Sequence, residues 1–154
     1  MRALIQRVSS ASLTVNGKEI SSIGNGMVVF LGIGHGDSKE DAIYLSEKIA
    51  NLRIFSDDEG RFDLSAIDTD SGVLLVSQFT LYADTRKGRR PSFIRAAPPE
   101  IAEPLMTEMA ELLRQLKLRV STGVFKAHMM VSLINDGPAT FMIDSIEKHT
   151  PRKA

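Results

Sequence analysis

The sequence contains no cysteine and no tryptophan. Without cysteine the chain cannot form disulfides, thiolate nucleophiles or cysteine metal sites, and such usage fits a reducing cytosol. No apolar run approaches the ~20 residues that a bilayer-spanning helix needs. The first residues also lack the apolar region of a signal peptide. We therefore expect a soluble, cytoplasmic protein without a membrane segment.

The sequence also lacks an excess of charge of either sign. It has 19 basic and 19 acidic residues among 154, so a general polycation that coats nucleic acid is excluded. A chain of this length can bury one substantial core but is short for two ordinary domains. We expect a single domain over residues 1–154.

The usual groupings of a hydrolase are missing as well. The three histidines, His35, His128 and His149, are scattered, and no Gly-x-Ser-x-Gly or metalloprotease motif occurs. The acidic residues between 52 and 71 lack the spacing of a calcium-binding loop and indicate a surface hairpin. We expect no metal and no cofactor. An enzyme of this kind needs an easy reaction, or a substrate that supplies a catalytic group.

Hydrophobic periodicity predicts an α+β fold with two helices segregated from six or seven strands. We expect a mainly antiparallel, barrel-like sheet. The predicted strands include residues 2–15, 27–33, 73–82, 127–134 and 139–145, and the helices begin near Ser38 and Pro98. Asp37 and Glu40 are spaced as a capping box for the first helix. Pro104 should kink or restart the second helix.

The stretch from Val73 to Phe93 carries most of the recognisable chemistry. Its apolar start predicts a central strand buried on both faces, after which alternation would place the Gln78 and Thr80 side chains on one face of a rigid strand end. A dense basic loop follows, whose natural partner is a phosphate chain. Its basic residues are Arg86, Lys87, Arg89 and Arg90.

Two further features allow alternative interpretations. Arg7 interrupts an apolar parity, so either a bulge near Ser9-Ser10 rotates it outward or it is a partly buried arginine that holds backbone carbonyls. Asn135-Asp136-Gly137-Pro138 is either a plain turn between two strands or a specially shaped backbone. Base rates favour a trans bond before Pro138, because only ~5% of X-Pro bonds are cis in folded proteins.

Two long motifs carry a specific resemblance to a known family. Residues 77–82 read SQFTLY and residues 135–140 read NDGPAT, and both occur in the expected order in a chain of the expected length. This pair resembles the signature of the D-aminoacyl-tRNA deacylases. The likeness spans nearly the whole chain and includes QRV at 6–8, GHGD at 34–37, NLRIF at 51–55 and YADTRKGRRPSF at 82–93.

The resemblance implies a homodimeric editing enzyme that hydrolyses the ester between a D-amino acid and the terminal ribose of a tRNA. It implies a cis bond between Gly137 and Pro138, which enter the partner's pocket and crowd the place of an L side chain. By the same similarity Arg7 orients that loop and Phe125 lines an adenine pocket. The implied catalytic residues are Ser77, Gln78, Phe79 and Thr80.

Physical chemistry adds expectations of its own. A pocket that blocks the Cβ of L residues does not block glycine, which has none, so glycyl-tRNA should also be hydrolysed. Backbone N–H groups around Phe79 and Thr80 can stabilise an oxyanion while the ribose 2′-hydroxyl assists, which dispenses with a protein base.

Two other function classes remain open from the sequence. The first is a non-catalytic RNA-binding module that uses the basic loop and stacks bases on Phe79, Tyr82 and Phe93. The second is an amidase or peptidase with Thr80 as nucleophile, which the sequence disfavours because no base accompanies the threonine.

Overall fold

A six-stranded sheet forms the centre of the molecule in a computed structural model that describes residues 1–150, so the last four positions of the predicted 1–154 domain lie outside the described residues. The strand order is β2-β1-β3-β6-β7, and β8 pairs with β1. The strands are β1 (Arg2–Val15), β2 (Lys18–Ile23), β3 (Gly26–Gly32), β4 (Phe55–Ser56), β5 (Phe62–Leu64), β6 (Gly72–Ser77), β7 (Arg119–Thr122) and β8 (Met129–Asp144). The helices are α1 (Lys39–Asn51), α2 (Pro99–Gln115) and two 3-10 turns, η1 (Phe79–Tyr82) and η2 (Ser145–His149).

The expected α+β fold, with a barrel-like sheet and two α-helices, is confirmed. Strand β1 pairs antiparallel with β2, β3 and β8, as the sequence indicated. The β3–β6 and β6–β7 pairs are parallel instead. The reason is the crossovers: α1 lies between β3 and β6 in the chain and α2 lies between β6 and β7, and a helical crossover returns the chain to start the next strand in the same direction.

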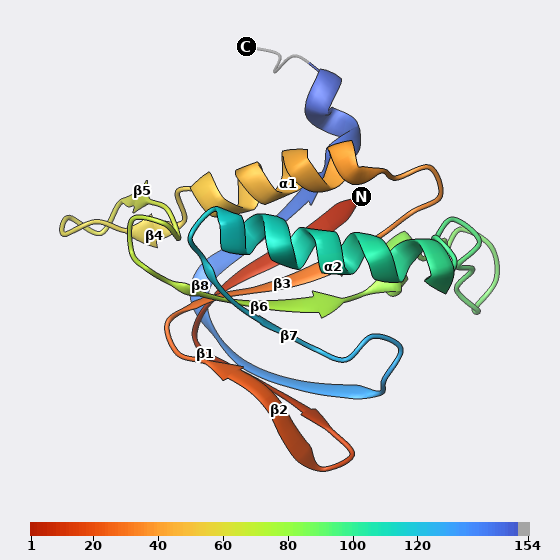
Figure 1. Cartoon of the computed structure of the whole chain (residues 1–154), viewed down its shortest axis with the longest axis horizontal. Helices are drawn as coiled ribbons and strands as arrows, with labels where there is room; N and C mark the ends of the chain where they lie inside the picture. The colour runs from red at the N-terminus through yellow and green to blue at the C-terminus, as the bar shows by residue number, and fades with distance from the viewer. Residues whose placement is uncertain (151–154) are drawn as a thin grey trace.

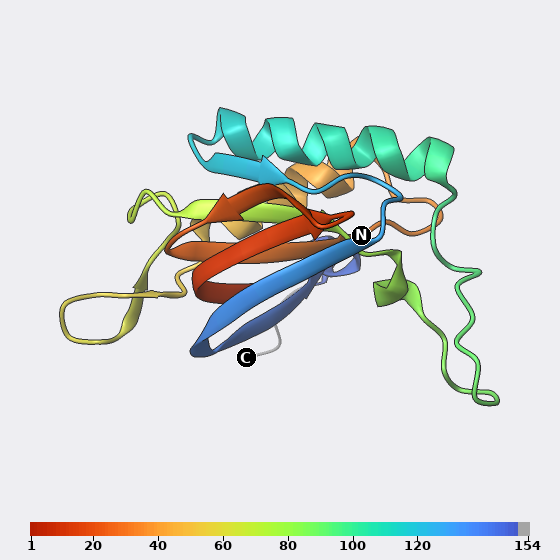
Figure 2. The ribbon, with the colours of Figure 1, turned by 90° about the horizontal axis from the view of Figure 1, so that it is seen from below.

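Both α-helices lie on one face of the sheet, side by side (Figures 1 and 2). On that face the odd residues of β3 pack against α1 and α2, and Met27 and Val29 are fully buried. The even residues face the inside of the curled sheet, where Val28 and Leu74 are also fully buried. Strands β3 and β6 are therefore covered on both faces, which explains their continuous apolar sequences.

The N-terminus of α1 differs from the prediction by one residue. Ser38 is the N-cap, and the Asp41 carboxylate accepts hydrogen bonds from the Ser38 N–H at 2.9 Å and from the Ser38 hydroxyl at 3.1 Å. Asp37 is not available as a cap because its carboxylate accepts from the Gly34 N–H at 2.6 Å. The second helix is not restarted at Pro104, which lies inside a continuous α2.

The two strands predicted at 127–134 and 139–145 form one strand, β8, of 16 residues. Both halves pair with β1 in the same antiparallel sense, and the register shifts twice between Gln6 and Ser10 of β1. The segment from Asn135 to Pro138 is therefore an irregularity within a strand and not a hairpin turn. The Gly137–Pro138 peptide bond within it is cis, where base rates favour trans.

Among the described residues, no helix is both long enough and apolar enough to cross a membrane.

Candidate functional site

The end of strand β6 turns into a short helix. The Gln78 N–H still donates to the Leu31 carbonyl of β3 at 2.8 Å, and η1 then begins at Phe79. The prediction that the alternating strand continues to residue 82 is wrong for residues 79–82. The turn brings the Tyr82 ring against Gly32 and Gly34, where it is buried, and this burial favours the turn over a continued strand.

A cavity of about 440 Å³ opens at this strand end. Its walls come from the ends of β3 and β6, from η1, from the segment before α2 and from the start of α2 itself. Residues that line it include Leu31, Ile33, Ser77, Gln78, Phe79, Phe93, Ala97, Met106 and Phe125. The structure thus brings together four residues that the sequence or the resemblance nominated: Ser77, Gln78, Phe79 and Phe125. Apolar groups dominate the walls, which suits a flat, largely apolar ligand group such as a nucleobase.

Thr80 lies on η1 with an exposed side chain, outside the residues that line this cavity. Its hydroxyl is hydrogen-bonded to the side-chain amide of Gln78. A carboxamide cannot take a proton from a hydroxyl near neutral pH, so this pair does not constitute a nucleophile with a general base. Phe79 is 57% exposed and contacts Phe93 edge-to-face, with ring centroids 5.0 Å apart.

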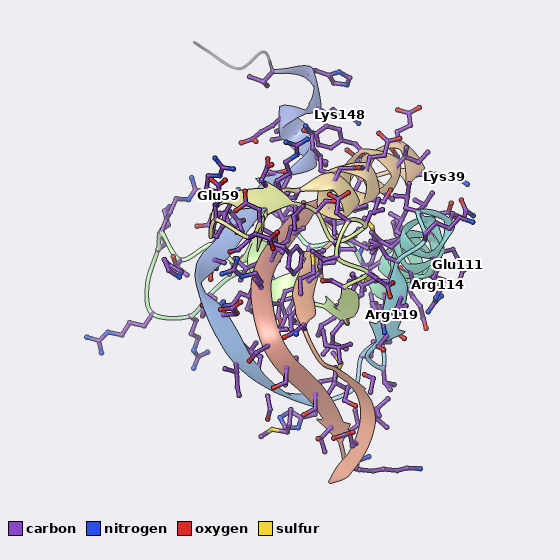
Figure 3. The ribbon with its side chains drawn as sticks, turned by 90° about the vertical axis from the view of Figure 1, so that its left-hand side faces the viewer. Lys39, Glu59, Glu111, Arg114, Arg119 and Lys148 are labelled. Atoms are coloured by element: carbon purple, nitrogen blue, oxygen red, sulfur yellow. The ribbon has the colours of Figure 1, made fainter. Side chains whose placement is uncertain are left out.

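The basic loop projects from the sheet directly after η1, and Figure 3 shows it as a pale green segment whose long side chains extend away from the body. Two hydrogen bonds between Asp84 and Ser92, at 2.8 and 2.9 Å, close its base. Arg86 forms an ion pair with Asp84, and the hydrogen bond from its side chain is the main reason that the pKa of the Asp84 carboxyl lies well below its usual range. Lys87, Arg89 and Arg90 are exposed.

Arg7 is a buried arginine that holds backbone carbonyls, with 8% of its surface exposed. It donates from Nε to the Asp136 carbonyl at 3.0 Å and from Nη1 to the Ile54 carbonyl at 2.6 Å. The Cζ of its guanidinium lies 4.9 Å from the centroid of the Phe62 ring, which covers it. The structure therefore supports the interpretation of Arg7 as a buried arginine that holds backbone carbonyls, and not the one in which a bulge rotates its side chain outward.

Asn135 is a positioning residue that the sequence did not single out. Its side-chain amide donates to the Arg7 carbonyl at 2.9 Å and to the Ala139 carbonyl at 3.2 Å, so it ties together the two ends of the irregular segment. A Cβ on Gly137 would lie 2.7 Å from the Asn135 Oδ1, so a larger residue there would displace the Asn135 side chain. The signal was present in the motif NDGPAT, but nothing in one sequence distinguishes this asparagine from an ordinary turn residue.

The Gly137–Pro138 segment and the cavity lie at different levels along the strands of the sheet. Asn135 pairs with Val8, and Val8 pairs with Gly26 at the start of β3. The cavity adjoins Leu31 near the other end of β3. Gly137 and Pro138 lie between the level of Asn135 and that of Thr140, which pairs with Gln6 opposite Val28. Three to five residues of strand therefore separate them from Leu31, or roughly 10–17 Å at about 3.3 Å per residue. Within one chain, Gly137 and Pro138 therefore do not reach the cavity.

No cluster of three or more potential metal-ligating side chains occurs within residues 1–150. His35, which stands between two glycines, is a loop residue whose N–H donates to the Arg95 carbonyl at 3.0 Å.

Comparison with known proteins gives a consistent family. The model of the family described as D-Tyr-tRNA(Tyr) deacylase matches residues 4–144. The D-aminoacyl-tRNA deacylase of Chloroflexus aurantiacus is 59% identical over 154 residues, which cover 100% of this chain and 96% of the relative. The D-aminoacyl-tRNA deacylase of Roseiflexus castenholzii is 57% identical over 152 residues, covering 99% and 97%.

Two solved structures share the fold. One is a c-Myc DNA Unwinding Element Binding Protein; it superposes with a TM-score of 0.88 at 40% identity and covers 94% of this chain and 98% of its own. The other is a probable eukaryotic D-amino acid tRNA deacylase; it superposes with a TM-score of 0.80 at 17% identity, covering 92% and 97%, and therefore supports the fold alone. With its family model matched over nearly its whole length and relatives above half identity, this chain belongs to the D-Tyr-tRNA(Tyr) deacylase family.

Proposed function

We propose that this protein is an editing hydrolase that cleaves the ester of D-aminoacyl-tRNA and releases free tRNA and the D-amino acid. The observation that carries the proposal is the cavity at the ends of β3 and β6, because it joins a base-sized apolar space to the backbone of η1 and to an adjacent basic loop. Family membership supports the reaction class. The enzyme acts in the cytoplasm, where aminoacyl-tRNA is used.

The terminal adenosine of the tRNA occupies the cavity, with its base against Phe125 and Phe93. This assignment places the ester beside the start of η1. The first N–H groups of a helical turn have no partner within the turn, so those of Phe79 and Thr80 are suited to an oxyanion. Lys87, Arg89, Arg90 and Arg86 lie on the loop that follows and contact the tRNA phosphates.

The ribose 2′-hydroxyl, next to the ester, assists the attack of water in place of a protein base. Thr80 then acts through its backbone, and Thr80→Ala should remain within about fivefold of the wild-type kcat/KM, whereas loss of a true nucleophile costs on the order of 10⁶. A tRNA that ends in 2′-deoxyadenosine should be a poor substrate. The opposite pattern, an inactive Thr80→Ala with a good deoxy substrate, would restore Thr80 as the nucleophile.

Chiral selection is assigned to a second copy of the chain. The Gly137–Pro138 segment of one protomer enters the cavity of the other, and its carbonyls occupy the place of an L side chain. The distance between this segment and the cavity within one chain supports a homodimer. Arg7 and Asn135 hold the segment through the contacts described above. Because this selection acts on Cβ, glycyl-tRNA should be hydrolysed as well.

The decisive experiment incubates the protein with matched D- and L-aminoacyl-tRNA and with glycyl-tRNA, and measures ester loss. The proposal predicts loss of the D and glycyl esters with the L ester intact. Binding without turnover would support a non-catalytic nucleic-acid-binding module, a function that the name of the DNA-unwinding-element relative also suggests. The structure disfavours the stacking platform of that module, because Tyr82 is buried and Phe79 and Phe93 pack on each other.

A further inference from the structure

One arginine of β1, Arg2, contacts the last two residues of the 3-10 turn η1. Arg2 donates from Nη1 to the Leu81 carbonyl at 2.9 Å, and its guanidinium lies 4.7 Å from the centroid of the Tyr82 ring. Its Nε donates to the Asp144 Oδ2, also at 2.9 Å. A single planar guanidinium thus contacts two consecutive residues of the turn while a carboxylate fixes its own orientation.

Tyr82, the last residue of η1, is fixed at both ends of its ring. Its Cδ2 lies beside Gly32, and its Cε1 and Cζ lie beside Gly34, where a Cβ would come within 2.6 Å of the ring. Its hydroxyl donates to the Asp37 Oδ2 at 3.2 Å, and the same oxygen accepts from the Gly34 N–H at 2.6 Å. Burial, together with the nearby carboxylates of Asp37 and Asp144, raises the pKa of Tyr82 well above its usual value, so the phenol remains a donor at neutral pH.

The opposite side of the turn offers little support. Phe79 is 57% exposed and contacts the Phe93 ring edge-to-face, and the Thr80 side chain is exposed, so few side-chain contacts hold these two residues on that side. Leu81 and Tyr82 follow them directly in a turn of four residues. In so short an element a shift of the Leu81 carbonyl or the Tyr82 ring moves the Phe79 and Thr80 amides, and productive geometry tolerates only about 0.5 Å.

We infer that Arg2 and Tyr82 are positioning residues for the deacylation reaction, which hold the backbone N–H groups of Phe79 and Thr80 in place from the side remote from the substrate. The chemical half of this inference rests on the proposed function, which assigns those N–H groups to the oxyanion. The mechanical half, that Arg2 and Tyr82 order the turn, rests on the contacts alone.

The network allows substitutions that remove one contact and leave the fold intact. A second cavity, of about 660 Å³, borders Arg2, Tyr82, Asp37 and Asp144, so water can reach groups that lose a partner. Tyr82→Phe removes only the hydroxyl and keeps the ring beside Gly34. Arg2→Lys keeps a cation for Asp144 but lacks the planar fork that reaches the Leu81 carbonyl. Tyr44→Phe and Arg53→Lys are matched controls, on α1 and on the surface beside Asp63.

The first measurement is the kinetics of D-aminoacyl-tRNA hydrolysis by the whole chain. Loss of one oxyanion donor costs about 10²–10³ in kcat, so displacement of the donors in Tyr82→Phe and Arg2→Lys should lower kcat by about tenfold. KM should stay within about twofold, because the base cavity and basic loop are unchanged. Both controls should retain wild-type kcat. An unchanged kcat in Tyr82→Phe and Arg2→Lys at a temperature where all variants are folded would overturn the inference.

The second measurement, amide hydrogen exchange, does not depend on activity. Exchange over residues 78–83 should be faster in Tyr82→Phe and Arg2→Lys, while exchange in β6 is unchanged. If the wild type fails to hydrolyse D-aminoacyl-tRNA, the proposed function is wrong, and exchange alone decides whether the two residues order the turn. Unchanged exchange over residues 78–83 in both variants would refute that ordering, whatever the protein's activity.

Discussion

At the scale of single residues, two side chains pack directly against glycines, in the space that a Cβ would occupy. Tyr82 fills the space beside Gly32 and Gly34, and Asn135 Oδ1 lies where a Cβ of Gly137 would point. These close approaches fix the turn before the basic loop and the irregular segment of β8. In both parts of the proposed site a residue larger than glycine would therefore displace a neighbouring side chain, the Tyr82 ring in one and the Asn135 amide in the other.

Gly34→Ala should test the first of these contacts. Its Cβ would lie 2.6 Å from the Tyr82 ring, which must shift, and overpacking of this kind costs about 1–3 kcal/mol of unfolding free energy. Urea unfolding measures this cost. Gly24→Ala is the matched control, because a Cβ there meets nothing within 4 Å. Equal midpoints for the two variants would show that the Tyr82 ring has room to move.

Arg7→Lys should weaken the hold on the Gly137–Pro138 segment. A lysine cannot reach the Asp136 and Ile54 carbonyls together, and a buried acceptor without a partner costs about 1–3 kcal/mol. We expect lower stability and, under the proposed function, faster hydrolysis of L-aminoacyl-tRNA relative to D. The ratio of the two rates is the measurement. Arg53→Lys, at an exposed ion pair, is the control and should leave the ratio unchanged. An unchanged ratio in Arg7→Lys would show that Arg7 does not contribute to chiral selection.

At the scale of elements, periodicity predicted the helices and the buried strands because each shows its own repeat in the sequence. The errors occur where tertiary contacts override the local pattern. Residues 79–82 alternate like a strand but form a 3-10 turn, because Tyr82 is drawn into the space above Gly34. A proline suggested a break at 135–138, yet β1 pairs with both halves of β8 and makes one strand of them.

The N-terminus of α1 gives a prediction on pH. Burial alone would raise the pKa of Asp41, but hydrogen bonds from the Ser38 backbone and from the Ser145, Lys148 and Ser38 side chains outweigh it and hold the pKa far below its usual range. The carboxylate also pairs with Lys148 at 3.0 Å, and Figure 3 shows that lysine on the C-terminal turn above α1. A depressed pKa contributes stability above the unfolded value of about 3.9, and this contribution is lost as pH falls toward the folded value.

Asp41→Asn should therefore be less stable than the wild type at pH 7 by about 1–2 kcal/mol, the usual worth of a helix cap and partly buried pair. The difference should shrink as pH falls below about 4, because the unfolded wild-type chain then binds a proton at Asp41 that the folded carboxylate, with its depressed pKa, does not bind. Urea unfolding at several pH values measures both effects. A difference that stays constant down to pH 2 would show that the Asp41 charge does not contribute.

The basic loop should determine how tRNA binding depends on salt. The logarithm of the tRNA association constant falls linearly with the logarithm of salt concentration, and each phosphate contact contributes about 0.7–0.9 to the steepness of that fall. Replacing Arg89 and Arg90 by glutamine should therefore make the slope less negative by about 1.5. Lys18→Gln, on β2, is a control with an exposed cation distant in sequence from the loop. Filter binding of deacylated tRNA at several salt concentrations gives the slopes. Equal slopes in the loop variant and the wild type would mean that the loop is merely solvated.

At the scale of the whole molecule, one chain holds both parts of the proposed site but keeps them apart. The cavity lies near the end of β3, and the Gly137–Pro138 segment lies level with its start. The outer face of β8 also leaves large apolar side chains in water, with Met130 61% and Ile134 63% exposed. A second copy that covers this face would bury them and could bring the two parts together.

If the proposed homodimer uses this face of β8, Ile134→Asp should weaken self-association, because a charge would have to be buried in the interface. Sedimentation equilibrium should show a dissociation constant at least about 100-fold higher, equivalent to about 2.7 kcal/mol. Ile146→Asp is the control, since Ile146 is 77% exposed on η2. Under the proposed function, the Ile134→Asp monomer should also lose selectivity against L-aminoacyl-tRNA. A dimer of unchanged affinity would place the interface elsewhere.

The sequence by itself determined the fold class, the buried strands, both helices and the identity of the two motifs, because hydrophobic period and residue order are local properties of the chain. Only the tertiary structure decided how these motifs are used. It placed the guanidinium of Arg7 on the Asp136 carbonyl, folded residues 79–82 into a 3-10 turn that buries the Tyr82 ring, and kept Gly137 and Pro138 out of the lining of the cavity in the same chain. Such contacts join residues far apart in the chain, and their energies depend on burial and direction, which no local pattern encodes.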